Sequence, residues 1–200
     1  MLIDGELKTG KVLFAHGAGA PMDSDFMQQM ALRLAKLGLQ VVRFEFPYMQ
    51  TIRETGKRRP PDRMPKLLDY FTQLIEEQVV DGQPLYLAGK SMGGRAASML
   101  LSHPAVSAGF VFGYPFHPRG KPDSLRVDHL KDLPKPLHIF QGERDPMGSL
   151  PEVTEYNLPP SVHVYWFEDG DHDIKPRKAS GFTQIQHMDH IAQIIGKQLS

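Results

Sequence analysis

The sequence has no cysteine, no net charge and no long apolar run, and each absence narrows the possibilities. Without cysteine, the protein forms no disulfide, uses no cysteine nucleophile and holds no metal through thiolates, and the composition fits a reducing compartment. Lysine and arginine total 23, as do aspartate and glutamate, so no overall basic field attracts nucleic acid or an anionic membrane. No apolar run approaches the ~20 residues of a membrane-spanning helix.

The length and the N-terminus add two further expectations. The first ten residues, MLIDGELKTG, carry acidic side chains and no apolar core, which argues against a signal peptide. A chain of 200 residues with 11 phenylalanines can bury a sizeable core, so we expect one domain over residues 1–200. These features predict a soluble, cytoplasmic protein, and they leave its oligomeric state open.

Short apolar runs alternate with segments of helical periodicity along the whole chain. The predicted strands are 11–16, 39–46, 85–90, 108–114, 137–142 and 162–168. The predicted helices are 23–38, 65–79, 92–101 and 183–199. Strands that alternate with helices favour an α/β fold, here a doubly wound, mostly parallel sheet of about six strands with helices on both faces.

Two Pro-rich, polar stretches interrupt this pattern, at residues 49–63 and 116–135. Each leaves the carboxyl end of a predicted strand, and we expect both to be irregular loops. Ligands of open parallel sheets bind at that edge, so the two stretches are candidate walls of a pocket.

The segment GKSMG, residues 89–93, matches the pattern G-x-S-x-G between a predicted strand and a predicted helix. A serine on such a tight turn is held in a strained backbone conformation with its hydroxyl exposed at the sheet edge. The glycines on either side avoid collisions with the neighbouring strand and helix. Gly94 has no role in this scheme beyond easing helix packing. The pattern makes Ser91 a candidate nucleophile, for which we expect a positive φ.

A serine nucleophile needs a histidine base and an acid that orients it, in the chain order Ser, acid, His. Asp145 follows the predicted strand 137–142, and His172 follows the strand 162–168. Both therefore lie at the same sheet edge as Ser91, and we expect His172 within hydrogen-bond reach of its Oγ. Glu143 is the alternative acid. Among the other histidines, His138 and His163 lie inside strands, where a structural role is expected. His187 and His190 share a helix face, and solvent exposure is favoured there over a metal site.

An acyl-transfer site also needs backbone N–H donors for the oxyanion. The residue after the nucleophile, Met92, supplies one. The small-residue loop after the first predicted strand, HGAGA at 16–20, supplies the other, with Ala18 favoured over Gly17 and Gly19. We expect His16 to brace this loop by hydrogen bonding rather than to bind a metal. The loop lacks the G-x-G-x-x-G pattern and the P-loop lysine, which argues against nucleotide binding.

Basic side chains are concentrated between residues 53 and 63, in an otherwise neutral protein. Arg58 and Arg59 are candidate substrate-binding residues for an anionic ester, together with Gly17 of the small-residue loop; the alternative is a solvated loop. Arg95, one turn into the helix after Ser91, is expected to brace the fold through an ion pair.

The segments KVLFAHGAGAPMDS, LAGKSMGGRAAS, GERDP and GDHDIKP together resemble the α/β-hydrolase superfamily. The resemblance extends from about Lys11 to Leu199 and is closest to the small dienelactone-hydrolase-like branch, with its bacterial predicted hydrolases and TEX/KANL-type proteins. It implies a serine hydrolase fold with a triad of Ser91, Asp145 and His172. The chain is too short for the lid domain of larger relatives, so we expect a minimal fold without a lid. The N-terminal antiparallel strands of larger relatives look missing from this chain.

The sequence therefore predicts a serine hydrolase that cleaves an ester or thioester of a small soluble molecule through an acyl-enzyme, with no cofactor and no metal. Two alternatives use the same fold. One is a non-catalytic interaction module, an alternative suggested by the TEX/KANL-type proteins, one of which is a subunit of a chromatin-modifying complex. The other is an acyltransferase with the same triad. Neither the acyl group nor the leaving group can be predicted.

Overall fold

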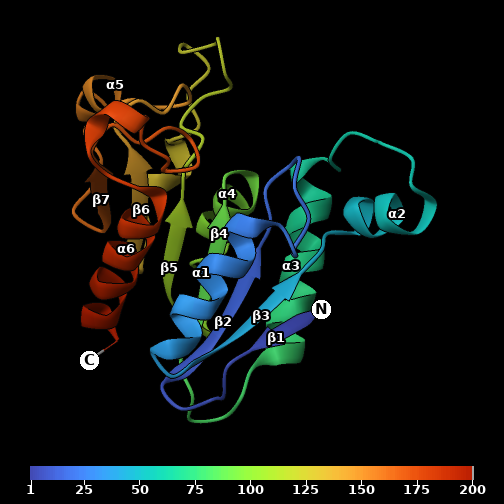
Figure 1. Cartoon of the computed structure of the whole chain (residues 1–200). Helices are drawn as coiled ribbons and strands as arrows, with labels where there is room; N and C mark the ends of the chain where they lie inside the picture. The colour runs from blue at the N-terminus through green and yellow to red at the C-terminus, as the bar shows by residue number, and fades with distance from the viewer. Residues whose placement is uncertain (200) are drawn as a thin grey trace.

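Six apolar runs form the parallel strands of one twisted sheet, in a computed structural model that describes residues 1–199 (Figure 1). A seventh strand, β1, pairs antiparallel at one edge, and the strand order is β1-β3-β2-β4-β5-β6-β7. The fold class predicted from the sequence is confirmed. The strands are β1 (Leu2–Asp4), β2 (Gly10–Ala15), β3 (Leu39–Phe44), β4 (Leu85–Lys90), β5 (Val106–Phe112), β6 (Leu137–Gly142) and β7 (Val162–Phe167).

The edge strand β1 corrects the expectation that the N-terminal antiparallel strands are missing. Its three residues lie opposite residues 41–43 of β3, and Asp4 accepts two hydrogen bonds from Arg43, at 2.8 and 3.1 Å. Both side chains of this ion pair are largely buried, at 7% and 14% exposure. A forked guanidinium–carboxylate pair fixes the strand register, although the strand itself is too short and too exposed to show an apolar pattern.

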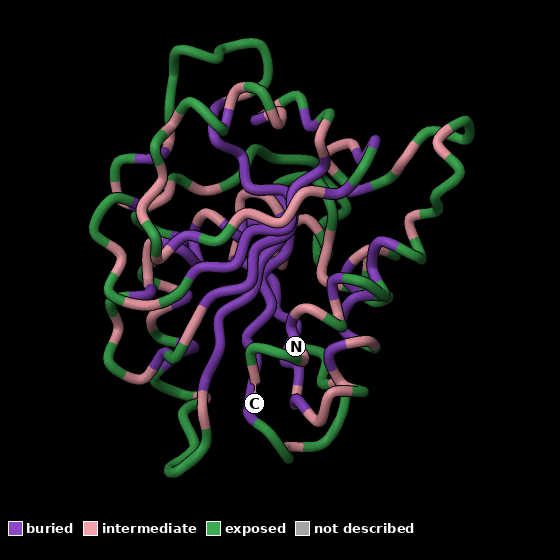
Figure 2. The backbone as a smooth tube through the Cα atoms, turned by 90° about the vertical axis from the view of Figure 1, so that its left-hand side faces the viewer, coloured by how far each residue is buried: buried purple, intermediate pink, exposed green. Residues whose placement is uncertain are grey.

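The strands bury both faces because their side chains alternate between two cores. In β2, Val12 and Phe14 belong to one core, whereas Leu13 and Ala15 belong to the other. Figure 2 shows the strands as the buried centre of the molecule, with exposed loops around them. Continuous apolar strands of this kind are typical of parallel sheets covered on both faces.

Helices from different parts of the chain cover the two faces (Figure 1). The face that carries Val12 and Phe14 is covered by α1 (Asp25–Lys36) and α6 (Gln184–Gln198), and the opposite face by α3 (Met64–Gln78) and α4 (Met92–Met99). Their amphipathic spacing explains the arrangement: in α1, Met27, Met30, Ala31 and Leu34 form one buried stripe. No helix among residues 1–199 is long and apolar enough to cross a membrane.

Part of the stretch at 49–63 is helical, which corrects the expectation of an irregular loop. Helix α2 (Pro47–Thr55) begins with a proline in its first turn and ends at Gly56, whose φ of 67° gives the left-handed cap. It buries Tyr48 and Met49, and residues 56–63 remain non-helical. Three further short elements are α5 (Leu150–Thr154) and the 3-10 turns η1 (Asp128–Leu130) and η2 (Lys178–Ser180).

Candidate active site

Ser91 occupies the sharp turn between β4 and α4 with φ 51° and ψ −116°. The positive φ predicted from the sequence is confirmed. Its backbone N–H donates to the carbonyl of Phe112 on the neighbouring strand β5 at 3.0 Å, which fixes the turn against the sheet. A non-glycine residue in this region costs about 1–3 kcal/mol, and such strain persists where the surrounding structure enforces it.

The three glycines around Ser91 are each required by a close approach. A Cβ at Gly89 would collide with the backbone of Gly93 and Gly94 at the start of α4. A Cβ at Gly93 would lie 2.5 Å from the carbonyl oxygen of His16, at the end of β2. At Gly94 it would strike the side chain of Val111 on β5. The first two collisions are those expected of the G-x-S-x-G turn, and the third shows that Gly94 lets α4 pack directly on the sheet.

Asp145 and His172 meet at the carboxyl edge of the sheet. His172 Nδ1 lies 2.7 Å from Asp145 Oδ2, and the Asp145 side chain is fully buried. Gln141 Nε2 donates to the same carboxylate at 2.9 Å and the backbone N–H of Met147 donates at 2.8 Å. Because an ionised carboxylate only accepts, His172 Nδ1 carries the proton and Nε2 has a free lone pair. This arrangement suits a base oriented by an acid.

Lys90 ties the His172 loop to the strand that precedes Ser91. Its buried Nζ donates to the backbone carbonyl of His172 at 2.8 Å and pairs with Asp173 at 3.1 Å. Burial lowers the pKa of Lys90, and Asp173 is the first of the nearby carboxylates that oppose this effect. The hydrogen bonds of residues 1–199 do not include one between Ser91 Oγ and His172, so that contact stays a prediction. Such bonds are often long before substrate binds.

Two backbone N–H groups near Ser91 are available for an oxyanion. Met92 is the first residue of α4, and the N–H of a first helical residue has no acceptor within its helix. In the small-residue loop, the N–H of Ala18 forms no hydrogen bond with the described part of the chain. Gly17 brings this loop next to the nucleophile, because a Cβ built on it would be 3.8 Å from Ser91 Cβ. The structure thus brings Ser91, Met92, Gly17 and Ala18 to the same edge.

His16 braces the small-residue loop, as expected. The ring is fully buried, Nδ1 lies 2.6 Å from the carbonyl of Gly17, and Nε2 accepts the N–H of Phe46 at 3.2 Å. Because Nε2 accepts, Nδ1 holds the proton and donates to Gly17. Burial lowers the pKa of His16, which keeps the ring neutral. Tyr48 Oη further fixes the loop by donating to the carbonyl of Ala18 at 3.0 Å.

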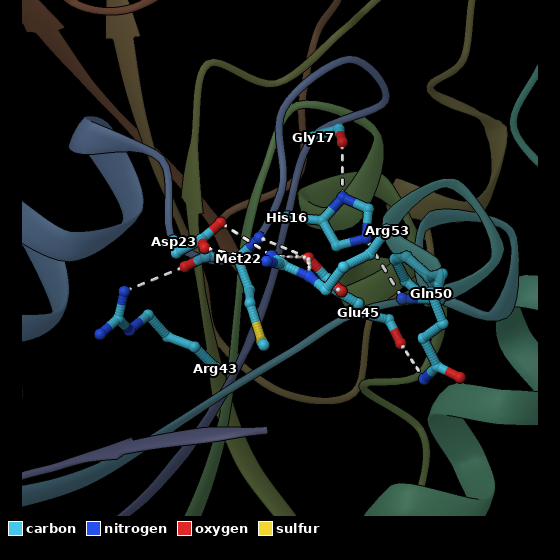
Figure 3. Close-up of polar contacts among 9 residues, drawn as sticks. His16, Gly17, Met22, Asp23, Arg43, Glu45, Gln50 and Arg53 are labelled. Atoms are coloured by element: carbon cyan, nitrogen blue, oxygen red, sulfur yellow. Dashed lines mark hydrogen bonds and ion pairs between the residues drawn. The ribbon is translucent and has the colours of Figure 1, made fainter. Parts of the chain in front are cut away.

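An ion-pair network holds the next part of the same loop (Figure 3). Arg53 on α2 pairs with Asp23 at 2.8 Å and with the buried Glu45, whereas Arg43 donates to the carbonyl of Met22 at 3.0 Å. The forked hydrogen bonds raise the pKa of Arg53, mainly through Glu45, and lower that of Asp23. Arg53 is therefore occupied by two protein carboxylates at short distance.

Arg58 and Arg59 line a groove beside the small-residue loop. The groove has a volume of about 510 Å³, and its wall includes Ala18 and Gly19 together with the apolar side chains of Met49 and Ile52. Both arginines are exposed. Arg59 makes one distant ion pair, at 3.9 Å to Asp62, and Arg58 makes none within residues 1–199. The groove therefore presents positive charge next to the candidate oxyanion donor.

The structure also decides among the alternative residues. Glu143 accepts the N–H of Asp169 at 3.1 Å and does not contact His172, so Asp145 is the acid that orients the imidazole. His187 is buried, with Nδ1 3.0 Å from the carbonyl of Ile174, which corrects the expectation of a solvated side chain. His190 is exposed, as expected.

Comparisons with known proteins show the family and the fold of this chain. Residues 8–200 match the family described as the alpha/beta hydrolase domain. The chain belongs to the α/β-hydrolase family. A serine hydrolase without a lid from Xanthomonas campestris is 17% identical, with a TM-score of 0.75 over 98% of this chain and 87% of that chain. An α/β serine hydrolase homologue from Coxiella burnetii is 18% identical, with a TM-score of 0.72 over 100% and 90%.

A dienelactone hydrolase from Anabaena variabilis is 19% identical, with a TM-score of 0.68 over 98% of this chain and 88% of that chain. The resemblance stated from sequence motifs is thus confirmed at the level of the α/β-hydrolase family. At these identities, the structural matches show the fold, which is the α/β-hydrolase fold without a lid.

Two residues that position the α/β-hydrolase site were missed by sequence reasoning. Lys90 fills the variable position before Ser91, and its partner His172 lies 82 residues later. Tyr48 lies in α2, 30 residues from its partner Ala18. Since both contacts join distant segments, no local pattern marks them. A lysine in an otherwise apolar strand, LYLAGK, is the one available signal for Lys90.

Proposed function

We propose that this α/β-hydrolase cleaves an ester or thioester of a small molecule through a serine nucleophile. One observation carries the proposal: the His172–Asp145 pair reaches the same sheet edge as the strained Ser91, although the three residues come from three separate loops. A structural role for Ser91 alone would not require the buried, hydrogen-bonded carboxylate behind His172.

In the proposed reaction, Ser91 Oγ attacks the substrate carbonyl carbon while its proton passes to His172 Nε2. The N–H groups of Met92 and Ala18 stabilise the negative charge on the carbonyl oxygen. The tetrahedral intermediate collapses, the bond to the alcohol or thiol breaks, and His172 returns the proton to that leaving group. The ester formed with Ser91 is then attacked by water, with His172 again as the base, and the acid is released.

The role of Asp145 in this scheme is electrostatic. Its buried carboxylate holds the Nδ1–H tautomer of His172 and stabilises the imidazolium formed in each step. The expected cytoplasmic location and the absence of a partner macromolecule stay predictions.

The proposal is tested by hydrolysis of a short p-nitrophenyl ester and the matching thioester, with wild-type protein and Ser91→Ala. We expect turnover by the wild type and none above background by the variant, with matching melting temperatures. Free acid as the product separates hydrolysis from acyl transfer to another acceptor. Equal rates for the two proteins would leave a non-catalytic α/β-hydrolase fold as the better account.

A further inference from the structure

Arg95 lies one turn after Ser91 and lacks the ion pair expected from the sequence. Its backbone N–H donates to the Ser91 carbonyl at 2.9 Å, which places it on the first turn of α4. Its Nε is buried without a hydrogen-bond partner, and no carboxylate within residues 1–199 pairs with the guanidinium. The ion-pair expectation is therefore wrong. A partly buried charge without a counterion is costly unless something else satisfies it.

Arg95 belongs to a polar cluster that also contains Ser98, His129 and the Tyr114 hydroxyl. Tyr114 Oη donates to the carbonyl of Arg126 at 2.8 Å and lies 3.4 Å from His129 Nε2, and the charge of Arg95 opposes the rise in the pKa of Tyr114 that burial causes. Ser98 Oγ donates to the carbonyl of Arg95 at 2.8 Å and lies 2.9 Å from His129 Nε2. Both hydroxyl protons are thus used, so His129 Nε2 carries the ring proton and donates to an oxygen.

A second cation, Arg126, contacts the Tyr114 hydroxyl through its backbone carbonyl, and no acidic side chain within the described residues pairs with its guanidinium. Burial, followed by the charge of Arg95, lowers the pKa of Arg126. The same two causes lower the pKa of His129 to about 4, so the ring is neutral. The nearby carboxylate of Asp128 is exposed and pairs with Lys131 at 3.0 Å. The cluster of Arg95, Arg126, Tyr114 and His129 therefore carries two positive charges and no negative charge.

The cluster is built on the same two segments that hold the nucleophile, α4 and the end of β5. Tyr114 follows β5 by two residues, and the last residue of β5, Phe112, accepts the N–H of Ser91 at 3.0 Å. Arg95 and Arg126 are only partly exposed, so each retains a face toward solvent while the surrounding protein limits hydration. Guanidinium groups in such a setting bind carboxylate and phosphate oxygens through paired hydrogen bonds.

We propose that Arg95 and Arg126 form a binding site for an oxyanion, the carboxylate or phosphate group of a substrate whose carbonyl reaches Ser91. The claim that this anion belongs to a substrate of Ser91 rests on the proposed hydrolase function. The claim that the cluster binds an anion does not. It is distinct from the groove at Arg58 and Arg59, whose cations are exposed and whose lining includes neither Arg95 nor Arg126.

The binding test uses Ser91→Ala, which removes turnover as a variable. The arginine Nε–Hε signals are followed by NMR while sodium succinate, sodium phosphate or sodium chloride is added at constant ionic strength. We expect saturable shifts of the Arg95 and Arg126 signals with succinate or phosphate and none with chloride. The anion that saturates at lower concentration identifies the group. Shifts that do not saturate, or that match those with chloride, would overturn the proposal.

A kinetic test compares monoethyl succinate with diethyl succinate, which differ in one negative charge. In Arg126→Met, the preference for the monoester, as a ratio of kcat/KM values, should fall at least tenfold relative to wild type. Arg119→Met, an exposed arginine of the same segment, is the matched control and should leave the ratio unchanged. An unaltered ratio in Arg126→Met would contradict the subsite. If wild type cleaves neither ester, the hydrolase proposal fails, and the NMR titration still decides the anion site.

Discussion

At the scale of single residues, the orientation of His172 depends on one buried carboxylate. In Asp145→Asn, the amide can donate to Nδ1, which favours the tautomer with its proton on Nε2 and removes the lone pair that accepts the Ser91 proton. We expect kcat for a p-nitrophenyl ester to fall about 10³- to 10⁴-fold, by analogy with other Ser-His-Asp sites. Glu143→Gln is the matched control, because Glu143 lies on the same loop without touching His172. A loss below tenfold in Asp145→Asn would argue against the triad.

The same scale shows which residues could be predicted from sequence. Three site residues come shortly after apolar strands: Ser91, Asp145 and His172. Because the carboxyl ends of parallel strands lie at one edge of the sheet, the chain positions of these residues already predict that they lie at the same edge. Arg95 could not be assigned in this way. Its surroundings come from Tyr114 and Arg126, on a segment without regular periodicity, and its position one turn into the helix after Ser91 does not show which side chains lie around it.

At the scale of elements, long amphipathic helices and continuous apolar strands were predictable, whereas short elements were not. Helix α2 has nine residues and a proline in its first turn, and its mainly polar sequence follows a strand without a turn signal. The tertiary contacts of Tyr48 and Met49 stabilise it, together with the pairs from Arg53. Because α2 carries Tyr48, which donates to the carbonyl of Ala18, failing to predict this helix also meant failing to predict a contact that holds the small-residue loop.

One buried histidine of the sheet, His138, makes the free energy of unfolding depend on pH. His138 on β6 stacks on Phe110 and His163, and burial, followed by the charge of His163, lowers the pKa of His138 to about 4. In the unfolded chain, His138 becomes protonated as the pH falls below 6.5, whereas in the folded protein it stays neutral until about pH 4. The free energy of unfolding therefore falls across this window, by up to about 3 kcal/mol from His138.

Urea denaturation between pH 7 and 4 measures this contribution. In His138→Phe, which keeps an aromatic ring in the stack, the decrease in unfolding free energy over the window should shrink by that amount. The exposed His190→Gln is the control and should keep the wild-type slope. A parallel slope in His138→Phe and wild type would contradict the assignment.

At the scale of the whole molecule, a neutral protein concentrates exposed positive charge at one side of its site. Arg58 and Arg59 line the groove next to Ala18, and exposed charges act on a ligand at long range. Reversal of both charges, in Arg58→Glu/Arg59→Glu, should raise KM for monoethyl succinate about tenfold at low salt. The effect should largely disappear in 1 M sodium chloride, where the Debye length is about 3 Å.

Arg119→Glu/Lys121→Glu is the matched control, because it changes the net charge equally on an exposed segment away from the groove. If this control raises KM as much as the groove variant, net charge rather than position explains the effect. The salt dependence also separates the groove from the Arg95 and Arg126 cluster, whose partly buried contacts should persist at 1 M salt.

The central claim of the account is that Ser91 is a nucleophile activated by His172. The most direct measurement is intact-protein mass spectrometry after incubation with a fluorophosphonate probe, followed by peptide mapping. We predict one added phosphonyl group per chain, located on Ser91, with no labelling of Ser91→Ala and strongly slowed labelling of His172→Ala. A folded wild-type protein that gains no label, or that is labelled at another residue, would contradict the account.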